Sequence, residues 1–284
     1  MVITRVPATT ANLGPGYDCL GVALQIHNRV TVSRQVTDEL PAPEAGGMVA
    51  QAAQAYFEAA GMEAFPFGWR IMGDVPRSRG MGSSVTVRLG LLTGLNQLAK
   101  TPLDRTQLFE LCARLEGHPD NAAPAAFGGF TVAGGTQLAR FEVAPELAFV
   151  LLIPDFEVST PAARQVLPEQ LDRLSAVASC ANACRITAAF ASRQYELLRG
   201  AFEDGLHQPF RQQLIPFLPD VLAAGEAAGA LGGFLSGSGS TICCVTLQDP
   251  EAVAAAMMEA SRSPTARYLI THAENAGTSI VAAE

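Results

Sequence analysis

Lysine is nearly absent from this sequence, because Lys100 is the single lysine among 19 basic residues. A Walker-type phosphate loop needs a lysine that follows a glycine-rich turn at the start of a helix. The octapeptide "GLNQLAKT", residues 94–101, departs from that motif at Ala99, where a glycine is required. It also ends a predicted helix, where the helix dipole repels anions. Any phosphate site must therefore use backbone amides, arginine, a metal ion or Lys100 itself.

Charged residues are also scarce, at 16% of the chain, and the net charge is −8. This acidic balance argues against a general affinity for nucleic acid or for an anionic membrane. Apolar residues make up 49% of the chain, yet no window of 18 or more apolar residues is free of charge. The first residues, "MVITRVPATTANLGPG", break into proline and glycine and do not read as a signal peptide. We expect a soluble cytoplasmic protein with no nucleic-acid or membrane partner.

No C-x-x-C pair occurs among the six cysteines, and most of them lie in apolar runs, which favours buried free thiols. The segment "EGHPDN" instead gathers Glu116, His118, Asp120 and Asn121, a spacing that could suit a metal ion or a general base. Pro119 breaks the helical face that a two-ligand zinc motif requires. Zinc is therefore not expected.

The pattern of predicted elements indicates an α+β protein with a boundary near residue 150. Strands dominate the first part, with helices inserted, and the composition turns strongly helical after Pro154 before two or three strands return. We expect helices at residues 48–60, 83–99 and 104–116, the last of them capped by Asp104. A glycine-turned hairpin is expected over residues 231–247.

The loop "GMGSS" precedes the predicted helix at 83–99 and has two interpretations. The first amides of a helix lack internal partners, so Gly80 and Gly82 would let an anion approach them while Ser83 and Ser84 add donors. Alternatively, Ser83 caps the helix after a glycine turn and no ligand is involved. The local pattern leaves both interpretations open.

Four segments, in this order, resemble the motifs of the GHMP kinase family: "PATTANLGPGYD", "PRSRGMGSS", "EGHPDNAAPAAFGGF" and "LGGFLSGSGST". The third, with "VSTPAARQVLP" and "QPFRQQLIP", is similar to the branch of that family that phosphorylates homoserine. The resemblance implies a two-domain α+β fold with ATP and substrate in the cleft between the domains. It implies a ribosomal protein S5 domain 2-like N-terminal domain at residues 1–150 and a ferredoxin-like C-terminal domain at 151–284.

The resemblance also implies the residues that bind ATP and Mg²⁺. Glu110 falls at the family position that binds the metal ion, and Ser84 or its neighbour Ser83 would help to hold it. The ion would offset the triphosphate charge in a site without lysine. The implied catalytic residues are Asp18, Asn121 and Glu110, with Asn121 standing where mevalonate-type kinases carry an aspartate base. The loop that would wrap the triphosphate consists of Pro76, Arg77, Ser78, Arg79, Gly80, Met81, Gly82, Ser83 and Ser84.

The same resemblance implies an amino-acid pocket for L-homoserine. Arg164 and Arg211 would clamp the substrate carboxylate, a task that suits guanidinium geometry. The amino and hydroxyl ends would be held by Asn12, Asp18, His118 and Thr160. Two alternatives stay open at this point: a GHMP kinase for another small alcohol, of the mevalonate or sugar type, and a non-catalytic binding protein with this fold. The family also suggests a homodimer and a role in threonine biosynthesis.

Overall fold

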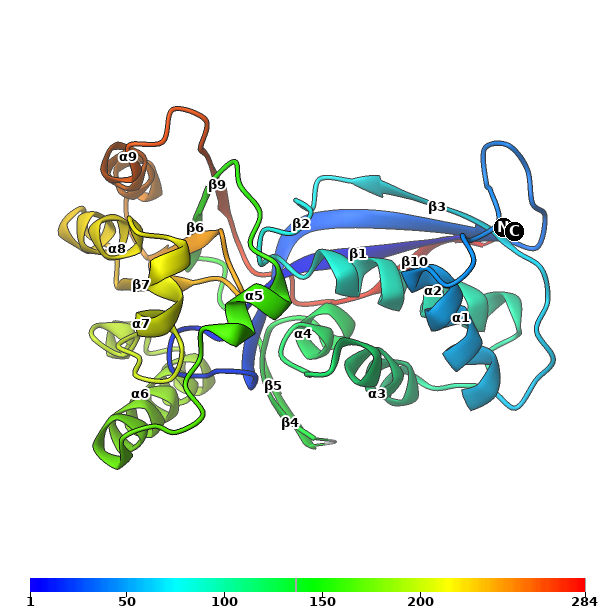
Figure 1. Cartoon of the computed structure of the whole chain (residues 1–284), viewed down its shortest axis with the longest axis horizontal. Helices are drawn as coiled ribbons and strands as arrows, with labels where there is room; N and C mark the ends of the chain where they lie inside the picture. Colours follow the sequence, from blue (N-terminus) through cyan, green and yellow to red (C-terminus); the bar gives the residue numbers. More distant parts are fainter. Residues whose placement is uncertain (136, 284) are drawn as a thin grey trace.

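The computed structural model describes residues 1–135 and 137–283, which form two β-sheets with helices packed on them (Figure 1). The first sheet has six strands in the order β10-β1-β2-β4-β5, with β3 paired to β2. Its strands are β1 (Val2–Ala11), β2 (Leu20–Ser33), β3 (Gly68–Gly73), β4 (Phe130–Gly134), β5 (Gln137–Phe141) and β10 (Ser279–Ala283). All their pairings are antiparallel.

Four helices cover one face of the first sheet (Figure 1). They are α1 (Met48–Ala59), α2 (Ser83–Leu98), α3 (Arg105–Glu116) and α4 (Ala122–Phe127). Helix α2 lies directly on β1 and β2, and glycine permits this close approach. A Cβ atom on Gly90 would lie 2.5 Å from Cγ2 of Val30, and one on Gly94 would lie 2.7 Å from Cγ2 of Val32. This packing holds α2 closely against the sheet.

The second sheet has four antiparallel strands in the order β7-β8-β6-β9. These strands are β6 (Ala148–Ile153), β7 (Gly232–Leu235), β8 (Ile242–Thr246) and β9 (Arg267–Thr271). Helices α8 (Leu218–Ala227) and α9 (Pro250–Ser261) pack on it. The remaining helices are α5 (Thr160–Gln165), α6 (Arg173–Ser192), α7 (Gln208–Arg211) and the 3-10 turns η1 (Tyr195–Leu198) and η2 (Gln212–Leu214).

One buried cluster joins the two sheets. Leu20 and Phe130 of the first sheet share it with Phe149 of the second. The ring of Phe130 also stacks on Phe190 of α6, with 4.2 Å between ring centroids. Because this shared core is apolar and fully buried, the hydrophobic effect holds the two halves in one arrangement.

Several elements expected from the sequence are confirmed. Asp104 caps α3 and forms a capping box with Gln107, as its position before a helical pattern predicts. Strands β7 and β8 form the expected hairpin. The boundary expected near residue 150 would place all of residues 151–284 in the second domain, but the last strand belongs to the first sheet. Strand β10 pairs with β1 and returns residues 279–283 to the first sheet, which places both termini near one another (Figure 1).

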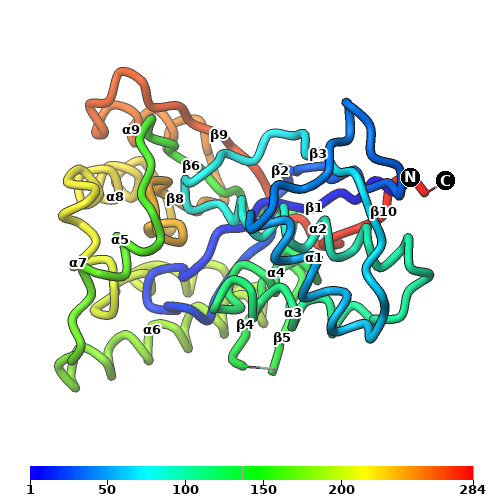
Figure 2. Tube along the Cα trace, turned by 45° about the vertical axis from the view of Figure 1, so that its right-hand side comes forward, coloured from blue at the N-terminus to red at the C-terminus, as the bar shows by residue number. Residues whose placement is uncertain are grey.

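The expectation of buried thiols is correct for part of the set. Cys112, Cys243 and Cys244 are buried, whereas Cys180 and Cys184 are exposed on α6. Helix α6 runs along the outside of the second half (Figure 2), and only 22% of its most apolar window is buried. Among the described residues this is the one helix long and apolar enough to cross a membrane, which is weak evidence because core helices of soluble proteins and signal sequences have the same length and composition.

Candidate active site

A cavity of about 260 Å³ opens where the two sheets meet. Its walls come from loops that are distant in sequence: the β1–β2 loop, the glycine-rich loop before α2, the turn between α3 and α4, and three segments of the second half. The lining residues are Asn12, Asp18, Ser78, Gly80, Met81, Gly82, Ser83, Ser84, Val85, Glu116, His118, Asp120, Asn121, Val158, Ser159, Thr160, Arg164, Arg211, Gly237 and Ser238. Most of the residues expected from the sequence are therefore brought together here.

The glycine-rich loop leaves the start of α2 open toward this cavity. Gly82 is the N-cap, with φ of 65°, and no side-chain hydrogen bond caps the helix among the described residues. Ser83 therefore does not cap the helix; its Oγ accepts a hydrogen bond from the backbone N–H of Ser78 at 3.3 Å. The first amides of a 16-residue helix thus remain free to bind an anion.

The turn between β7 and β8 holds the glycine-rich loop in place. The Ser236 hydroxyl donates to the carbonyl oxygen of Gly80 at 2.7 Å, and Gly237 N–H donates to the carbonyl of Ala11 at 3.1 Å. A Cβ atom on Gly80 would lie 2.1 Å from the carbonyl oxygen of Ser236, and Gly80 has φ of 70°. Both the space and the backbone conformation therefore require glycine at this position.

One carboxylate reaches the start of α2, and it belongs to Glu116. The Ser84 hydroxyl donates to Oε2 of Glu116 at 2.8 Å, and Arg88 donates to the other carboxylate oxygen. Glu110, the residue expected at this position, does not line the cavity in the described structure. The two glutamates are six residues apart on α3, a rotation of about 240°, so they lie on different faces of the helix. The structure thus places Glu116, and not Glu110, in contact with Ser84.

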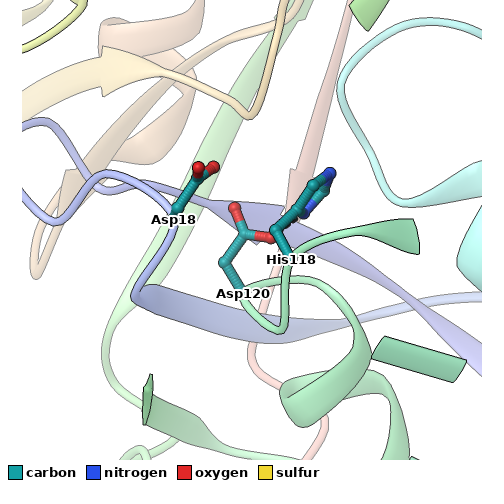
Figure 3. A group of neighbouring side chains, drawn as sticks. All are labelled: Asp18, His118 and Asp120. Atoms are coloured by element: carbon teal, nitrogen blue, oxygen red, sulfur yellow. Dashed lines mark hydrogen bonds and ion pairs between the residues drawn. The ribbon is translucent and has the colours of Figure 1, made fainter. Parts of the chain in front are cut away.

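A second group of ionisable side chains faces the cavity: Asp18, His118 and Asp120 (Figure 3). Their ligand atoms lie within 4.8 Å of one another, so the group is a candidate site for a cation. His118 Nδ1 is 2.6 Å from Oδ1 of Asp120, and this hydrogen bond raises the pKa of His118 against the opposing effect of burial. The same carboxylates could hold an ammonium group as readily as a metal ion.

Asn121 is held as a neutral side chain at the floor of the cavity. The Thr9 hydroxyl donates to Oδ1 of Asn121 at 2.7 Å, and Nδ2 of Asn121 donates to Asp120 at 3.2 Å. With its amide oxygen and nitrogen both engaged, Asn121 has no group that can take up a proton. It serves to fix the position of its neighbours.

The two arginines of the cavity differ in environment. Arg164 is partly exposed, and its Nη2 donates to both carboxylate oxygens of Asp18 at 2.9 and 3.0 Å. Its Nη1 donates to the Tyr17 hydroxyl at 2.9 Å. Arg211 is only 2% exposed, and burial lowers its pKa. Its Nε donates to the carbonyl of Ala163 at 3.0 Å and its Nη1 donates to the carbonyl of Gly237 at 2.9 Å.

The second terminal nitrogen of Arg211, Nη2, has no hydrogen-bond partner among the residues that the structure describes. Nη2 is not among the buried side-chain atoms of the described residues that lack a partner, so it is open to the cavity. Because Arg211 lines the cavity, its free donor provides a binding point for an anionic group of a ligand. Asn12 and Thr160 line the same cavity, as expected.

Not every residue of the expected phosphate loop lines the cavity. Arg79 turns toward the second half, where its Nε donates to the carbonyl of Pro154 at 3.0 Å and its Nη1 lies 3.4 Å from Glu157. Arg77 lines a neighbouring cavity of about 410 Å³, and Pro76 lies outside both cavities. The neighbouring cavity shares Ser78, Ser83 and Ser84 with the first.

The walls of the neighbouring cavity are largely apolar. They include Met48, Val49, Trp69, Ile71 and Val87, with Glu44 and Arg77 as charged members. A flat ring system would find apolar and aromatic surface here, next to the free amides of α2. The two cavities together suit one ligand with an anionic part and an aromatic part.

Comparisons with known proteins show the family of this chain. Residues 47–129 match the family described as GHMP kinases N terminal domain, and residues 186–262 match GHMP kinases C terminal. A homoserine kinase from Synechococcus is 40% identical over 274 residues, covering 90% of each chain. One from Desulfitobacterium hafniense is 35% identical over 99% of this chain and 100% of its own.

Solved structures give the same result. A crystal structure of homoserine kinase from Cytophaga hutchinsonii has a TM-score of 0.85 at 25% identity and covers 99% of this chain and 97% of its own. The mevalonate kinase of Methanococcus jannaschii superposes with a TM-score of 0.72 at 13% identity, covering 96% and 98%. At that identity the likeness concerns the fold alone.

Proposed function

The chain belongs to the homoserine kinases of the GHMP kinase family, and on that premise we propose how its cleft binds and phosphorylates homoserine. The reaction transfers the γ-phosphoryl group of ATP to the side-chain hydroxyl of L-homoserine and yields O-phospho-L-homoserine. The two-domain α+β fold expected from the resemblance is the fold of this family. The roles of individual residues below are our proposal.

The triphosphate binds at the start of α2. The amides of Ser83, Ser84 and Val85 lack helical partners and face the cavity, and the helix dipole adds partial positive charge. The adenine ring occupies the neighbouring cavity, where Trp69 and Ile71 supply apolar contact. This arrangement does without the lysine that a Walker loop places at the start of a helix, since the single lysine, Lys100, follows the end of α2.

Ser84 and Glu116 are the residues that would hold Mg²⁺. A hydroxyl and a carboxylate already in contact at 2.8 Å, beside the proposed triphosphate site, supply the oxygen ligands that this ion prefers. When bound, Mg²⁺ neutralises phosphate charge as it develops. Arg88 contributes by pairing with the other oxygen of Glu116, which orients the carboxylate.

Homoserine binds between the two halves. Its carboxylate meets the free donor of Arg211, and its ammonium group lies near Asp18 and Asp120. Asn12, His118 and Thr160 complete the walls of this pocket. Arg164 forms an ion pair with Asp18 and acts mainly by neutralising that carboxylate. The carboxylate clamp expected from two arginines therefore depends chiefly on Arg211. An acceptor that lacks a carboxylate would leave Arg211 unpaired.

Catalysis in this arrangement rests on alignment and charge neutralisation. Asn121 cannot accept a proton, and Asp18 is engaged by Arg164, so neither residue acts as a strong general base. The loose transition state of phosphoryl transfer needs little proton abstraction before the bond to phosphorus forms. The residues of the cleft therefore contribute by holding the hydroxyl in line with the γ-phosphorus.

The single observation that carries the acceptor assignment is the buried, incompletely paired Arg211 beside two carboxylates. A neutral sugar would pair with neither the guanidinium nor the carboxylates. A binding protein without catalytic activity would not need the Ser84–Glu116 pair.

The assignment predicts the order of acceptors in an ADP-release assay. With Mg-ATP, we expect turnover of homoserine to exceed that of mevalonate, galactose and shikimate by at least about a hundredfold in kcat/KM, because only homoserine matches both charges. No turnover of homoserine, or faster turnover of another acceptor, would contradict the assignment.

We also propose that the enzyme is a homodimer that acts in the cytoplasm in threonine biosynthesis. Helix α6 supports the dimer, because Leu174 and Val177 of this helix are 76% and 61% exposed. Many of the residues that follow them in the helix are small. A second copy of α6 would cover this apolar face.

A double substitution tests the dimer. Leu174→Glu with Val177→Glu is expected to reduce the mass measured by light scattering from twice 29.8 kDa to 29.8 kDa, since it places charge in an apolar contact. Met72→Glu, at an apolar position of β3 that is 59% exposed, is the control and should leave the mass unchanged. A monomeric wild type, or a dimer that survives the double substitution, would refute the α6 interface.

A further inference from the structure

We infer that His207, in its neutral form with the proton on Nε2, positions Arg211 and thereby sets the preference of the pocket for a carboxylate-bearing acceptor. The inference rests on the role proposed for Arg211 and adds a residue that lies outside the cavity walls. His207 precedes α7 and is completely buried, while Arg211 ends that helix.

Two contacts determine which ring nitrogen of His207 carries the proton. Nε2 lies 2.8 Å from the carbonyl oxygen of Gly14, which can only accept a hydrogen bond. Nδ1 lies 3.3 Å from Nη1 of Arg211, which can only donate one. Both contacts require the same tautomer, with a donor at Nε2 and an acceptor at Nδ1.

The surroundings of His207 keep the ring neutral. Burial has the largest effect and lowers the pKa of His207; the charge of Asp204 opposes this effect, and the charge of Arg211 adds to it. Asp204 Oδ2 lies 3.5 Å from Nε2 of His207, the nitrogen that carries the proton in this tautomer. The same carboxylate accepts hydrogen bonds from the backbone N–H groups of Leu206, His207 and Gln208 at 2.6, 3.1 and 2.7 Å. The lone pair on Nδ1 therefore remains available to Arg211 at neutral pH.

This lone pair completes the set of acceptors that orients the guanidinium. Nε of Arg211 donates to the carbonyl of Ala163. Nη1 donates to the carbonyl of Gly237 and to Nδ1 of His207. Nη2 is the donor left for a ligand. His207 also ties this assembly to the β1–β2 loop through Gly14. The Tyr17 ring packs against both residues, with 5.2 Å between its centroid and that of the His207 ring and 5.1 Å between its centroid and Cζ of Arg211.

The two nitrogens can be tested separately with amide side chains. Asn places an amide oxygen near the position of Nδ1, whereas Gln places an amide nitrogen near that of Nε2. His207→Asn therefore retains an acceptor for Arg211, and His207→Gln retains the donor to Gly14. The readout is the ratio of kcat/KM for homoserine to that for 3-amino-1-propanol, which is homoserine without its carboxylate.

We expect His207→Gln to lower this ratio about tenfold, since a hydrogen bond to a charged group is lost, and His207→Asn to keep it within about twofold. The KM for ATP should stay unchanged in both. A merely structural role would instead lower kcat/KM equally for both acceptors, and a ratio preserved in His207→Gln would overturn the inference.

A measurement on the wild-type enzyme does not depend on the variants folding. The nitrogen chemical shifts of ¹⁵N-labelled histidine should report one neutral ring protonated at Nε2 throughout pH 6–8. A charged ring or the opposite tautomer would overturn the inference even in an active kinase. Failure of the wild type to phosphorylate homoserine would instead refute the proposed function, so the two failures are distinguishable.

Discussion

Replacing Glu116 by Gln is expected to lower kcat about a thousandfold, because the substitution removes a charged oxygen ligand from the proposed Mg²⁺ site of a phosphoryl-transfer enzyme. The variant should also need a higher Mg²⁺ concentration for half-maximal rate. Ser84 loses its carboxylate partner, and Arg88 loses the charge that it pairs with. Steady-state rates over a titration of Mg²⁺ measure both effects.

Glu110→Gln is the matched control for this experiment. It changes the same residue type on the same helix, but Glu110 does not line the cavity among the residues described, so the rate should stay within about twofold of the wild type. Thermal unfolding of both variants separates catalysis from stability, because Glu116 is 8% exposed and its loss of charge also destabilises the fold. A larger rate loss in Glu110→Gln than in Glu116→Gln would reverse the assignment.

Replacing Arg211 by Ala is expected to lower kcat/KM for homoserine about a thousandfold, mainly through KM. The guanidinium is the buried partner proposed for the substrate carboxylate, so its removal leaves that carboxylate unpaired in a desolvated pocket. The KM for ATP should change little, because the triphosphate site at the start of α2 is formed by another segment.

The acceptor without a carboxylate provides the internal control for Arg211→Ala. Turnover of 3-amino-1-propanol should fall much less than turnover of homoserine, since that acceptor offers nothing for Arg211 to bind. Arg267→Ala, which removes an exposed arginine of β9, should leave both reactions unchanged. Equal losses for both acceptors, or an equal rise in the two values of KM, would contradict the proposed role of Arg211.

The open helix start proposed as the phosphate site could be predicted from the sequence, because its physical cause is local. The loop "GMGSS" and the apolar pattern after it predict a helix whose first amides are accessible, and α2 begins at Ser83 as this pattern requires. The sequence could not predict the orientation of Arg79, because its partners Pro154 and Glu157 lie in the other half of the molecule.

The sequence could not predict which glutamate of α3 contacts Ser84. The segment "EGHPDN" already marked it as part of a polar cluster, yet family spacing favoured Glu110. The choice between two glutamates of one helix depends on helical phase and on where α2 lies beside α3. That position is set by glycine contacts with the strands beneath α2, which no count of residues along α3 reveals.

The sequence by itself determined the α+β class, the main helices, the Asp104 cap and the glycine-rich loop, since each depends on neighbours within a few residues. Only the tertiary structure decided which carboxylate meets Ser84, that β10 returns to β1, and that His207 and Gly14 orient Arg211. These contacts join segments up to about 280 residues apart, and the packing of the whole chain brings them together.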